Sequence, residues 1–279
     1  MPYAHYVKPG STVKLKDLDP SGHGGLEKEE ADFRRHEMGQ RVEEMQELMY
    51  AANMNSLLLV LQGCDTSGKD GSIKSILSYV NVQSCRVASF KQPTHLEASH
   101  DFLWRAHEQV PALGGMTIFN RSHYEDVLVV RVHDLVSKQV CKKRYEQINH
   151  FEELLADSGT IIVKFFLHIS KDEQEKRLLA REEDADKSWK LSVGDWSERE
   201  LWKDYQKAFT DALEACSTDC APWYVVPANH KWFRDLAIME ALETTLKPYR
   251  QTWHEHLKEV GVERKKELEA YRQKNNIKT

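Results

Sequence analysis

The sequence predicts an α/β fold with a parallel sheet that helices cover on both faces. Residues 56–62 and 160–168 are the clearest observations, because each is a strand-sized apolar run, as expected of a strand buried on both faces. Stretches with apolar residues at helical spacing separate these and shorter apolar runs along the chain. Strands that alternate with helices indicate right-handed crossovers between parallel strands.

The remaining elements continue this alternation. Strands are expected at about 56–62, 86–90, 116–119, 160–168 and 223–227, and helices at about 29–53, 71–79, 97–110, 124–135, 142–155, 171–183, 198–216, 232–246 and 249–275. Residues 1 to about 30 are rich in Gly, Pro, Ser and Lys and are expected to form an extended arm. No internal repeat or low-complexity linker divides the chain, so 1–279 is expected to be one domain, with a lid at about 182–198 and a C-terminal helix at about 249–279.

Composition argues against several classes of protein. The chain has 279 residues, of which 44 are acidic and 39 basic, without the broad basic excess of a nucleic-acid binder. No apolar run approaches the roughly 18–20 residues that cross a bilayer, and the N-terminus lacks the apolar region of a signal peptide, so a cytoplasmic protein is expected. The five cysteines are dispersed, and Cys216 and Cys220 have no second pair to complete a zinc pattern, which favours reduced thiols.

The strongest motif is the segment Gly63-Cys64-Asp65-Thr66-Ser67-Gly68-Lys69. It follows a buried strand and precedes a helix, which is the context that the G-x-x-x-x-G-K phosphate-binding loop requires. Its glycines let backbone amides surround a phosphate, the helix directs its positive end there, and Lys69 supplies a charge. The expected phosphate contacts are Gly63, Thr66, Ser67, Gly68, Lys69, Asp70 and Gly71. The alternative is an ordinary strand–turn–helix connection whose glycines are there by chance.

Two acidic residues distinguish this loop from the common pattern. Asp70 stands where the usual loop carries Ser or Thr to contact magnesium. Asp65, inside the loop, is a carboxylate that can coordinate or orient a metal, and an acid among phosphates is unfavourable unless a cation lies between them. The sequence therefore predicts Mg²⁺ at Asp65. The alternative is that Asp65 only hydrogen-bonds the loop.

A polar cluster follows the strand at 116–119. Residues just past the carboxyl ends of parallel strands line the ligand crevice, so this cluster should face the phosphate loop. Arg121 suits bidentate contact with phosphate, and Glu125 and Asp126 could bind metal, a nucleotide base or a ribose. The binding candidates are Asn120, Arg121, Ser122, Glu125 and Asp126. The alternative is a helix N-terminus with the acids that such termini favour.

Basic residues surround the expected lid. Arg177 and Arg181 are four apart on one helix and project from the same face, and Lys187 and Lys190 follow them. Cations that close over a transferring phosphoryl group stabilise its developing charge. The alternative is a solvated face whose charges pair along the helix.

Several strings resemble the second family of polyphosphate kinases. They are GCDTSGKDGSIK (63–74), FNRSHYE (119–125), KFFLHIS (164–170), WK (189–190) and APWYVVPANHKW (221–232), and the similarity spans roughly residues 30 to 250. The resemblance implies a P-loop kinase-like fold, similar to thymidylate kinase, with a helical lid. It also implies inorganic polyphosphate as donor, Mg²⁺ as cofactor, Asp65 and Lys69 as the essential loop pair, Arg121 as phosphate clamp and Arg181 as a lid arginine.

The resemblance extends to a subclass. The residues at 68–71 together with 123–125 resemble the members that accept AMP as well as ADP and can raise AMP to ADP and ADP to ATP. Many members have Asp where this chain has Asn120, which weakens the transfer of a metal-ligand role to that position. Related enzymes are dimers or tetramers, so a homo-oligomer is expected.

The expected reaction is direct in-line transfer, in which Lys69, Arg121, Arg181 and a metal neutralise charge and no strong base is needed. Lys74, Lys91 and Lys231 are candidates for a polyphosphate channel or are plain surface lysines. Two other functions stay open from the residues alone. One is an ATP-dependent nucleotide kinase of the same fold, and the other is a non-catalytic module that binds polyphosphate or nucleotide.

Overall fold

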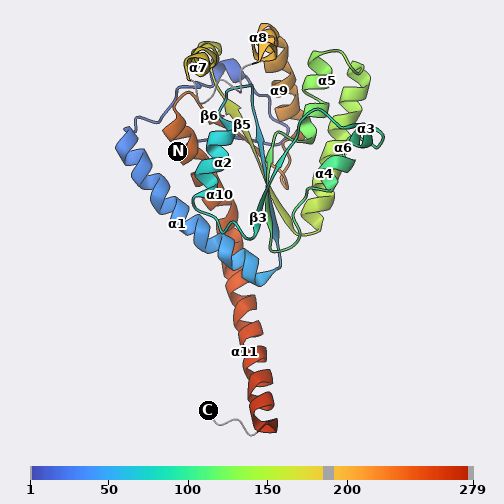
Figure 1. The fold of residues 1–279 in the computed structure, drawn as a ribbon. Coiled ribbons are helices and arrows are strands. Elements are labelled where there is room, and N and C mark those ends of the chain that lie inside the picture. The colour runs from blue at the N-terminus through green and yellow to red at the C-terminus, as the bar shows by residue number, and fades with distance from the viewer. Residues whose placement is uncertain (1, 185–191, 276–279) are drawn as a thin grey trace.

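A six-stranded sheet forms the centre of the structure, a computed structural model that describes residues 2–184 and 192–275 (Figure 1). The strands are β1 (His5–Val7), β2 (Ser56–Gln62), β3 (Cys85–Ser89), β4 (Met116–Asn120), β5 (Thr160–His168) and β6 (Trp223–Pro227), in the order β1-β6-β5-β2-β4-β3. Strands β2 to β6 run parallel, as predicted. The segment 1–30, expected to be an extended arm, also contributes the short strand β1, which was not predicted and which pairs antiparallel with β6.

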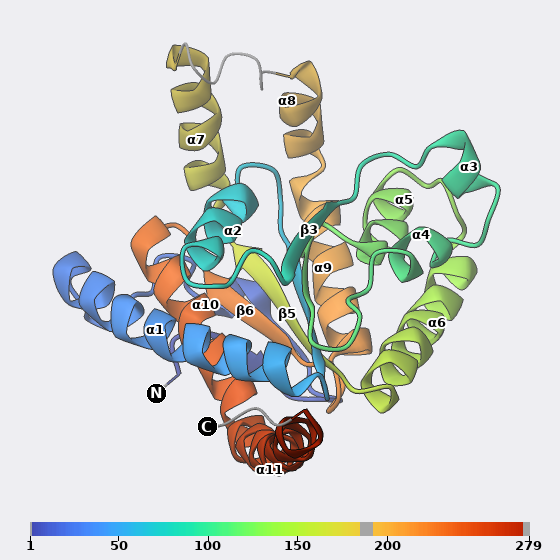
Figure 2. The same cartoon turned by 60° about the horizontal axis from the view of Figure 1, so that its bottom comes forward.

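Helices cover both faces of the sheet. They are α1 (Lys28–Ala52), α2 (Lys69–Leu77), α3 (His95–Ala98), α4 (Trp104–His107), α5 (Val129–Val132), α6 (Lys138–Asp157), α7 (Lys171–Glu183), α8 (Val193–Glu200), α9 (Trp202–Cys216), α10 (Lys231–Leu246) and α11 (Arg250–Lys274). Helices α1, α2 and α10 lie on one face, and α6 and α9 lie on the other (Figures 1 and 2). The layers are those of a doubly covered α/β sheet.

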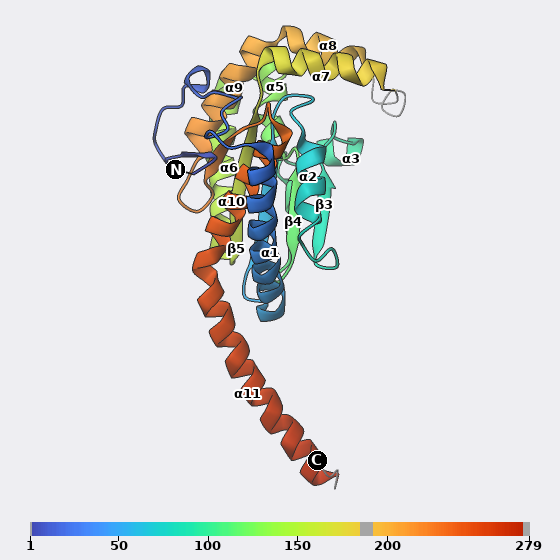
Figure 3. The same cartoon turned by 90° about the vertical axis from the view of Figure 1, so that its left-hand side faces the viewer.

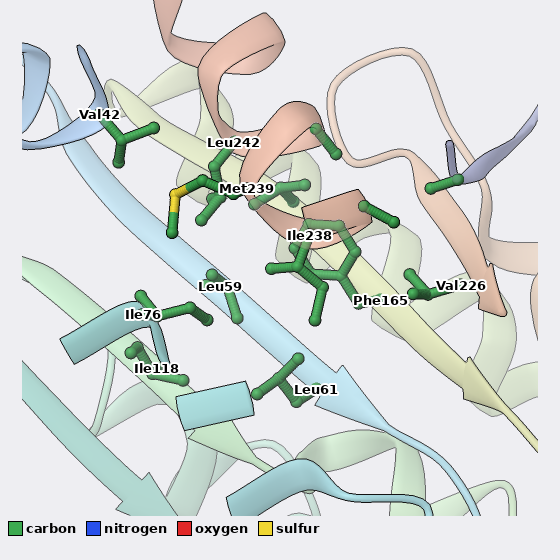
Figure 4. Close-up of a cluster of buried hydrophobic side chains, with 14 of the residues drawn as sticks. Val42, Leu59, Leu61, Ile76, Ile118, Phe165, Val226, Ile238, Met239 and Leu242 are labelled. Atoms are coloured by element: carbon green, nitrogen blue, oxygen red, sulfur yellow. The ribbon is translucent and has the colours of Figure 1, made fainter. Parts of the chain in front are cut away.

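The central strand β2 is buried along its whole length, which confirms the interpretation of its apolar run. Its side chains alternate between two hydrophobic clusters, so that Leu59 and Leu61 face one and Val60 faces the other. Figure 4 shows the first cluster, in which Leu59 and Leu61 lie near Phe165 of β5 and Met239 of α10. This rigid strand therefore ends at a fixed point, directly before the phosphate loop.

The helix predicted at 97–110 was wrong as a continuous element, because local hydrogen bonds divide it into α3 and α4. Thr94 and Glu97 form a capping box that starts α3 earlier than predicted. The Asp101 carboxylate then accepts from the backbone N–H of Leu103 at 2.9 Å, which begins a new turn before α4. Apolar spacing alone does not reveal these competing side-chain bonds.

Two other predicted helices are also interrupted. The segment 124–135 forms a short 3-10 helix (His123–Asp126) and then α5, because Ser122 Oγ accepts from the backbone N–H of Tyr124 and turns the chain tightly. The segment 198–216 breaks at Leu201, which ends α8 and precedes α9. The break lets α8 rise beside α7 above the sheet (Figure 2).

The last helix, α11, leaves the body of the molecule and extends well beyond it (Figure 3). Its first turns are anchored by Trp253, which is fully buried and whose indole N–H donates to Asn55 Oδ1 at 2.9 Å. From Val262 onward nearly every residue of the helix is exposed. In residues 2–184 and 192–275 no helix is both long and apolar enough to cross a membrane.

Candidate active site

The phosphate loop joins the end of β2 to the start of α2. Gly68 has φ +105°, a left-handed conformation that favours glycine, and Thr66 adopts φ +62° despite its branched side chain. A Cβ on Gly63 would lie 2.9 Å from the carbonyl oxygen of Leu167, so the loop also packs closely on β5. Helix α2 begins at Lys69, two residues earlier than predicted, and its first amides have no intrahelical acceptors. This end of α2 is therefore suited to bind an anion.

Lys69 lies beneath the loop with only 8% of its surface exposed. Its Nζ donates to the carbonyl oxygens of Gly63 at 2.8 Å and Cys64 at 3.2 Å. Burial lowers the pKa of Lys69, and nearby Arg121 lowers it further. Within the described ranges its ammonium has no carboxylate partner. The Asp65 and Glu125 carboxylates oppose this lowering without forming an ion pair with the ammonium, so the site favours an added anion.

Arg121 connects the loop to the end of β4. One Nη donates to Asp65 Oδ1 and the other to Glu125 Oε2 at 2.9 Å. Arg121 has φ +61°, so its backbone is held in a sparsely populated conformation. Such strained conformations are common at functional sites. The sequence analysis expected the polar cluster after the strand at 116–119 to face the phosphate loop, and these two bonds place Arg121 of that cluster beside Asp65 of the loop.

A second pair joins the same two segments. Asn120 Nδ2 donates to Asp70 Oδ1 at 2.9 Å, and both side chains line the cleft described below. Ser122, in contrast, is fully buried, and its Oγ accepts from Gln62 Nε2 and from the N–H of Tyr124. The structure thus brings Asn120 to the site but turns Ser122 inward, where it shapes the turn.

A cleft of about 1210 Å³ lies above the carboxyl ends of the strands. Sites that hold a single small ligand occupy about 300–1,000 Å³, so this cleft has room for a nucleotide and a phosphate chain together. The predicted residues that line it are Asp65, Thr66, Gly68, Lys69, Asp70, Gly71, Lys91, Asn120, Arg121, Glu125, Asp126, Arg177, Arg181 and Lys231. Gly63 lines a small adjoining cavity, and Lys74 is exposed on α2 outside both lining sets.

Arg177 uses all five of its N–H groups within the protein. Nε donates to Glu173 at 2.7 Å, Nη1 to the carbonyls of Thr66 and Ser67, and Nη2 to those of Ala228 and Asn229. These bonds tie the phosphate loop to the segment between β6 and α10. In this arrangement Arg177 has no donor left for a phosphate, although the sequence predicted it as a phosphate ligand.

Arg181 holds α7 and α8 together. Its Nη1 donates to Asp195 Oδ2 at 2.7 Å, and Trp196 Nε1 donates to Glu182 at 3.0 Å. Burial raises the pKa of Asp195, and the nearby Asp65 carboxylate raises it further. The two helices extend beyond the same end of the sheet (Figure 2), and Arg177, Ala180 and Arg181 of α7 line the cleft. Lys187 and Lys190 of the predicted lid lie outside the described residues.

Several buried charged residues near the site were not predicted from the sequence. Arg105 donates to the carbonyl of Lys91 at 2.8 Å and to Asp126 at 3.2 Å, and its guanidinium lies 5.6 Å from the ring centre of Phe90. Burial raises the pKa of Asp126, although Arg105 opposes that effect. Arg234 also lines the cleft and is 2% exposed. Neither arginine has a sequence signal, because both lie in segments interpreted only as helix.

A charged cluster lies behind the Arg121 turn. Lys164 of β5 and Glu152 of α6 are fully buried and form an ion pair, and Lys164 also donates to Tyr124 Oη and to the carbonyl of Cys216. Tyr124 donates to Glu152 at 2.9 Å. The sequence contains one sign of this ion pair, which is that Lys164 interrupts an otherwise apolar strand. A lysine buried in such a strand is almost always paired with an acidic residue.

Comparison with known proteins agrees with this fold. The model of the family "Polyphosphate kinase 2" matches residues 25–253, most of the chain. The chain belongs to the polyphosphate kinase 2 family. It is 48% identical over 242 residues to the AMP/ADP-polyphosphate phosphotransferase of Meiothermus ruber, covering 86% of this chain and 91% of that protein. It is 42% identical over 246 residues to the ADP-polyphosphate phosphotransferase of Rhodopseudomonas palustris, covering 84% of each.

A solved member of the polyphosphate kinase 2 family has the same fold. The crystal structure of the enzyme from Arthrobacter aurescens TC1 superposes with a TM-score of 0.84 at 40% identity, covering 90% of this chain and 93% of that one. The P-loop kinase-like fold and the family predicted from the sequence are therefore confirmed.

The chemistry of the cleft fits a divalent cation shared with a substrate. Asp65 and Asp70 offer carboxylate oxygens beside Lys69, and the buried Oγ1 of Thr66 has no hydrogen-bond partner in the described part of the chain. No three His, Cys, Asp or Glu side chains among the described residues gather into a metal site. Magnesium is commonly held by one or two carboxylates together with substrate phosphates, so this donor set is sufficient.

Proposed function

We propose that this protein uses inorganic polyphosphate to phosphorylate AMP to ADP and ADP to ATP. The observation that carries the proposal is the convergence of Lys69 and Arg121 on one cleft with room for both substrates. The names of the Meiothermus and Rhodopseudomonas relatives support the same donor and acceptors. The reaction class is phosphoryl transfer, which depends mainly on positioning and charge stabilisation.

The proposed mechanism is a direct in-line transfer. A terminal phosphate oxygen of the acceptor forms a bond to the end phosphorus of polyphosphate, while the anhydride bond to the next phosphate breaks and the shortened chain leaves with the electron pair. The acceptor oxygen is already an anion, so no general base is required. Lys69 exchanges its carbonyl acceptors for phosphate oxygens, and Arg121 neutralises the equatorial oxygens. Arg181 adds charge from α7.

Phosphotransferases of this kind typically need a divalent metal, and we propose Mg²⁺ held at Asp65. Bound there, the ion would neutralise phosphate oxygens between the two substrates. The Asp65–Arg121 pair suits this role, because the pair positions the carboxylate at the loop before substrates arrive.

Separate parts of the cleft suit the two substrates. Glu125 and Asp126, with Phe90 and Arg105 nearby, form a partly aromatic wall suited to the nucleoside of the acceptor. Lys91 and Lys231 line the cleft, which favours a role in holding polyphosphate, whereas Lys74 is exposed outside the cleft lining. Arg177 is proposed to position the loop through its carbonyl bonds instead of contacting phosphate.

The test is a donor assay without ATP. Purified protein is incubated with polyphosphate, magnesium and either AMP or ADP, and nucleotides are separated by ion-exchange chromatography. New ADP or ATP that requires polyphosphate supports the proposal. Product formed only when ATP replaces polyphosphate would indicate an ATP-dependent nucleotide kinase, and no product from either donor would indicate a binding module.

Other sequence-based expectations remain predictions. They are the single domain with a lid over about 182–198, a homodimer or homotetramer, a cytoplasmic location and the absence of nucleic-acid partners. Size-exclusion chromatography with light scattering measures the assembly directly.

A further inference from the structure

We propose that Arg234 is a direct ligand of the polyphosphate donor and helps the enzyme prefer that donor to a nucleoside triphosphate. The inference rests on the proposed function and adds a residue that the motifs did not indicate. Arg234 lies in the first turn of α10, three residues after Lys231, so both side chains project from the same side of the helix. Helices α2 and α10 lie side by side (Figures 1 and 2), and both residues line the cleft.

The Arg234 guanidinium packs directly on the two glycines at the start of α2. A Cβ on Gly68 would overlap Nη1, and a Cβ on Gly71 would lie 3.1 Å from Nη2. These glycines therefore make room for a charged group at the end of the phosphate loop, in addition to meeting the backbone needs of the loop. A guanidinium so close to the positive end of a helix gains no favourable interaction from the helix itself.

Arg234 is only partly satisfied within the protein. It is 2% exposed, and its Nε and Nη2 both contact Asp235 Oδ1 at 2.8 Å. Nη1, at the loop, has no hydrogen-bond acceptor anywhere in residues 2–184 and 192–275. Arg234 lines the cleft, so the donors of Nη1 remain available to an anion that binds there.

Neighbouring charges strengthen the case for an anion. The Nη1 of Arg177 lies 3.7 Å from the Cβ position of Gly68, so two guanidinium groups meet at this point. Burial lowers the pKa of Arg177, and Arg234 lowers it further, which reports the repulsion between them. All the N–H groups of Arg177 are hydrogen-bonded within the protein, so Nη1 of Arg234 is the guanidinium nitrogen of this pair that can bind an anion.

The place of Arg234 at the loop indicates which kind of phosphate compound it binds. Arg121 reaches the loop at Asp65, whereas Arg234 reaches it at Gly68, so the two arginines serve different phosphates. A donor chain bound over Lys69 can continue past Gly68 toward Arg234 and Lys231. A polyphosphate keeps one negative charge on each successive unit there, whereas a nucleoside triphosphate brings a neutral ribose and base. The buried guanidinium of Arg234 can therefore form charge-assisted hydrogen bonds with polyphosphate at this position but not with the ribose or base of a nucleoside triphosphate.

The experiment compares Arg234→Gln with the matched control Arg264→Gln, which changes an exposed arginine of α11. Steady-state kinetics should give a rise of about 10-fold or more in the KM for polyphosphate, the scale of a lost charged hydrogen bond, with the KM for AMP unchanged. Calorimetric titration of polyphosphate without acceptor should show the same loss of affinity. Arg234→Lys should recover part of it.

Other outcomes separate the explanations. Unchanged affinity for polyphosphate in Arg234→Gln, with wild-type protein active on polyphosphate, would overturn this inference alone. Equal losses for both substrates with a lower melting temperature would assign Arg234 a structural role and overturn it too. Should Arg234→Gln fail to fold, Gly71→Ala displaces Nη2 without removing charge, and an unaltered polyphosphate KM there would also count against the proposal. Wild-type protein that ignores polyphosphate would defeat the proposed function itself.

Discussion

At the scale of single residues, the environment of Lys69 favours the binding of phosphate and does not stabilise the free protein. Its ammonium is buried, contacts two carbonyl oxygens and has a lowered pKa because of burial and Arg121. Buried charges of this kind persist where they bind a ligand of opposite charge. The residue is therefore expected to contribute to turnover and not to the stability of the free protein.

Lys69→Met should lower turnover about 10²-fold or more, the scale of losing one preorganised charge donor. Its melting temperature should equal or exceed that of the wild type, because an unpaired buried charge is removed. The donor assay and thermal unfolding measure the two effects. Near-normal turnover would discard the assignment of Lys69 to the phosphate.

The site residues that could be predicted from the sequence are those whose place is set by a neighbouring strand. Lys69 and Arg121 were predictable because their positions after buried strands fix them at one edge of the sheet. Most partners of Arg177 were not predictable, because four of its five acceptors are backbone carbonyls from two distant loops. Arg234 was missed for the same reason, since only the packing of α10 on α2 brings it to Gly68.

At the scale of elements, the Lys164–Glu152 ion pair joins β5 to α6 behind the turn that carries Arg121. Both residues are fully buried, and Tyr124 bonds to each of them. A buried pair loses more when one partner is removed than when both are, because removal of one leaves the other charge unpaired. The cluster is thus a strong constraint on how these elements pack.

Lys164→Met and Glu152→Gln should each destabilise the protein, the lysine substitution by about 3–5 kcal/mol. The double substitution Lys164→Met with Glu152→Leu should cost clearly less than the sum of the two single changes. Urea unfolding followed by circular dichroism measures these free energies. Strictly additive losses would show that the two side chains do not interact in solution.

The same pair predicts a pH dependence of stability. Burial alone would raise the pKa of Glu152, but Lys164 and His123 outweigh it and the net shift is downward. A lowered folded-state pKa gives stability that is present above the ordinary value of 4.5 and lost as pH falls toward the folded value. The unfolding free energy of Glu152→Gln should therefore vary less over that acidic range than that of the wild type.

The elements themselves were predicted unevenly. Strands β2 and β5 were located to the residue, because a continuous apolar run admits few interpretations at that length. The helix at 97–110 was wrong because the Thr94 capping box and Asp101 redirect the backbone. Strand β1 was missed, since three residues with one buried side chain carry too little pattern.

At the scale of the whole molecule, the cleft exists only because distant segments converge. The phosphate loop, the turn after β4, helix α7 and the start of α10 all border it, and topology places them at the carboxyl end of the sheet. Helix α11 extends away from the end of the molecule where α7 and α8 lie (Figure 3), and none of its described residues lines the cleft. Catalysis and the exposed part of α11 should therefore be separable.

Removal of residues 262–279 should leave the melting temperature and the kinetics of the remaining chain nearly unchanged, because that part of α11 is exposed where it is described. Trp253→Ala, in contrast, should cost about 3–5 kcal/mol, since it empties a fully buried site. Differential scanning calorimetry measures both. A large loss of stability in the truncated chain would mean that the exposed helix packs on another subunit.

The most direct measurement of the central claim is a crystal structure with AMP, magnesium and a polyphosphate analogue whose bridging oxygens are replaced by methylene groups. We expect the end phosphate to lie against the amides of Gly68 and Lys69, with Lys69 Nζ released from the Gly63 carbonyl and Arg121 facing the acceptor phosphate. An analogue bound elsewhere, with Lys69 still hydrogen-bonded to the loop carbonyls, would contradict it.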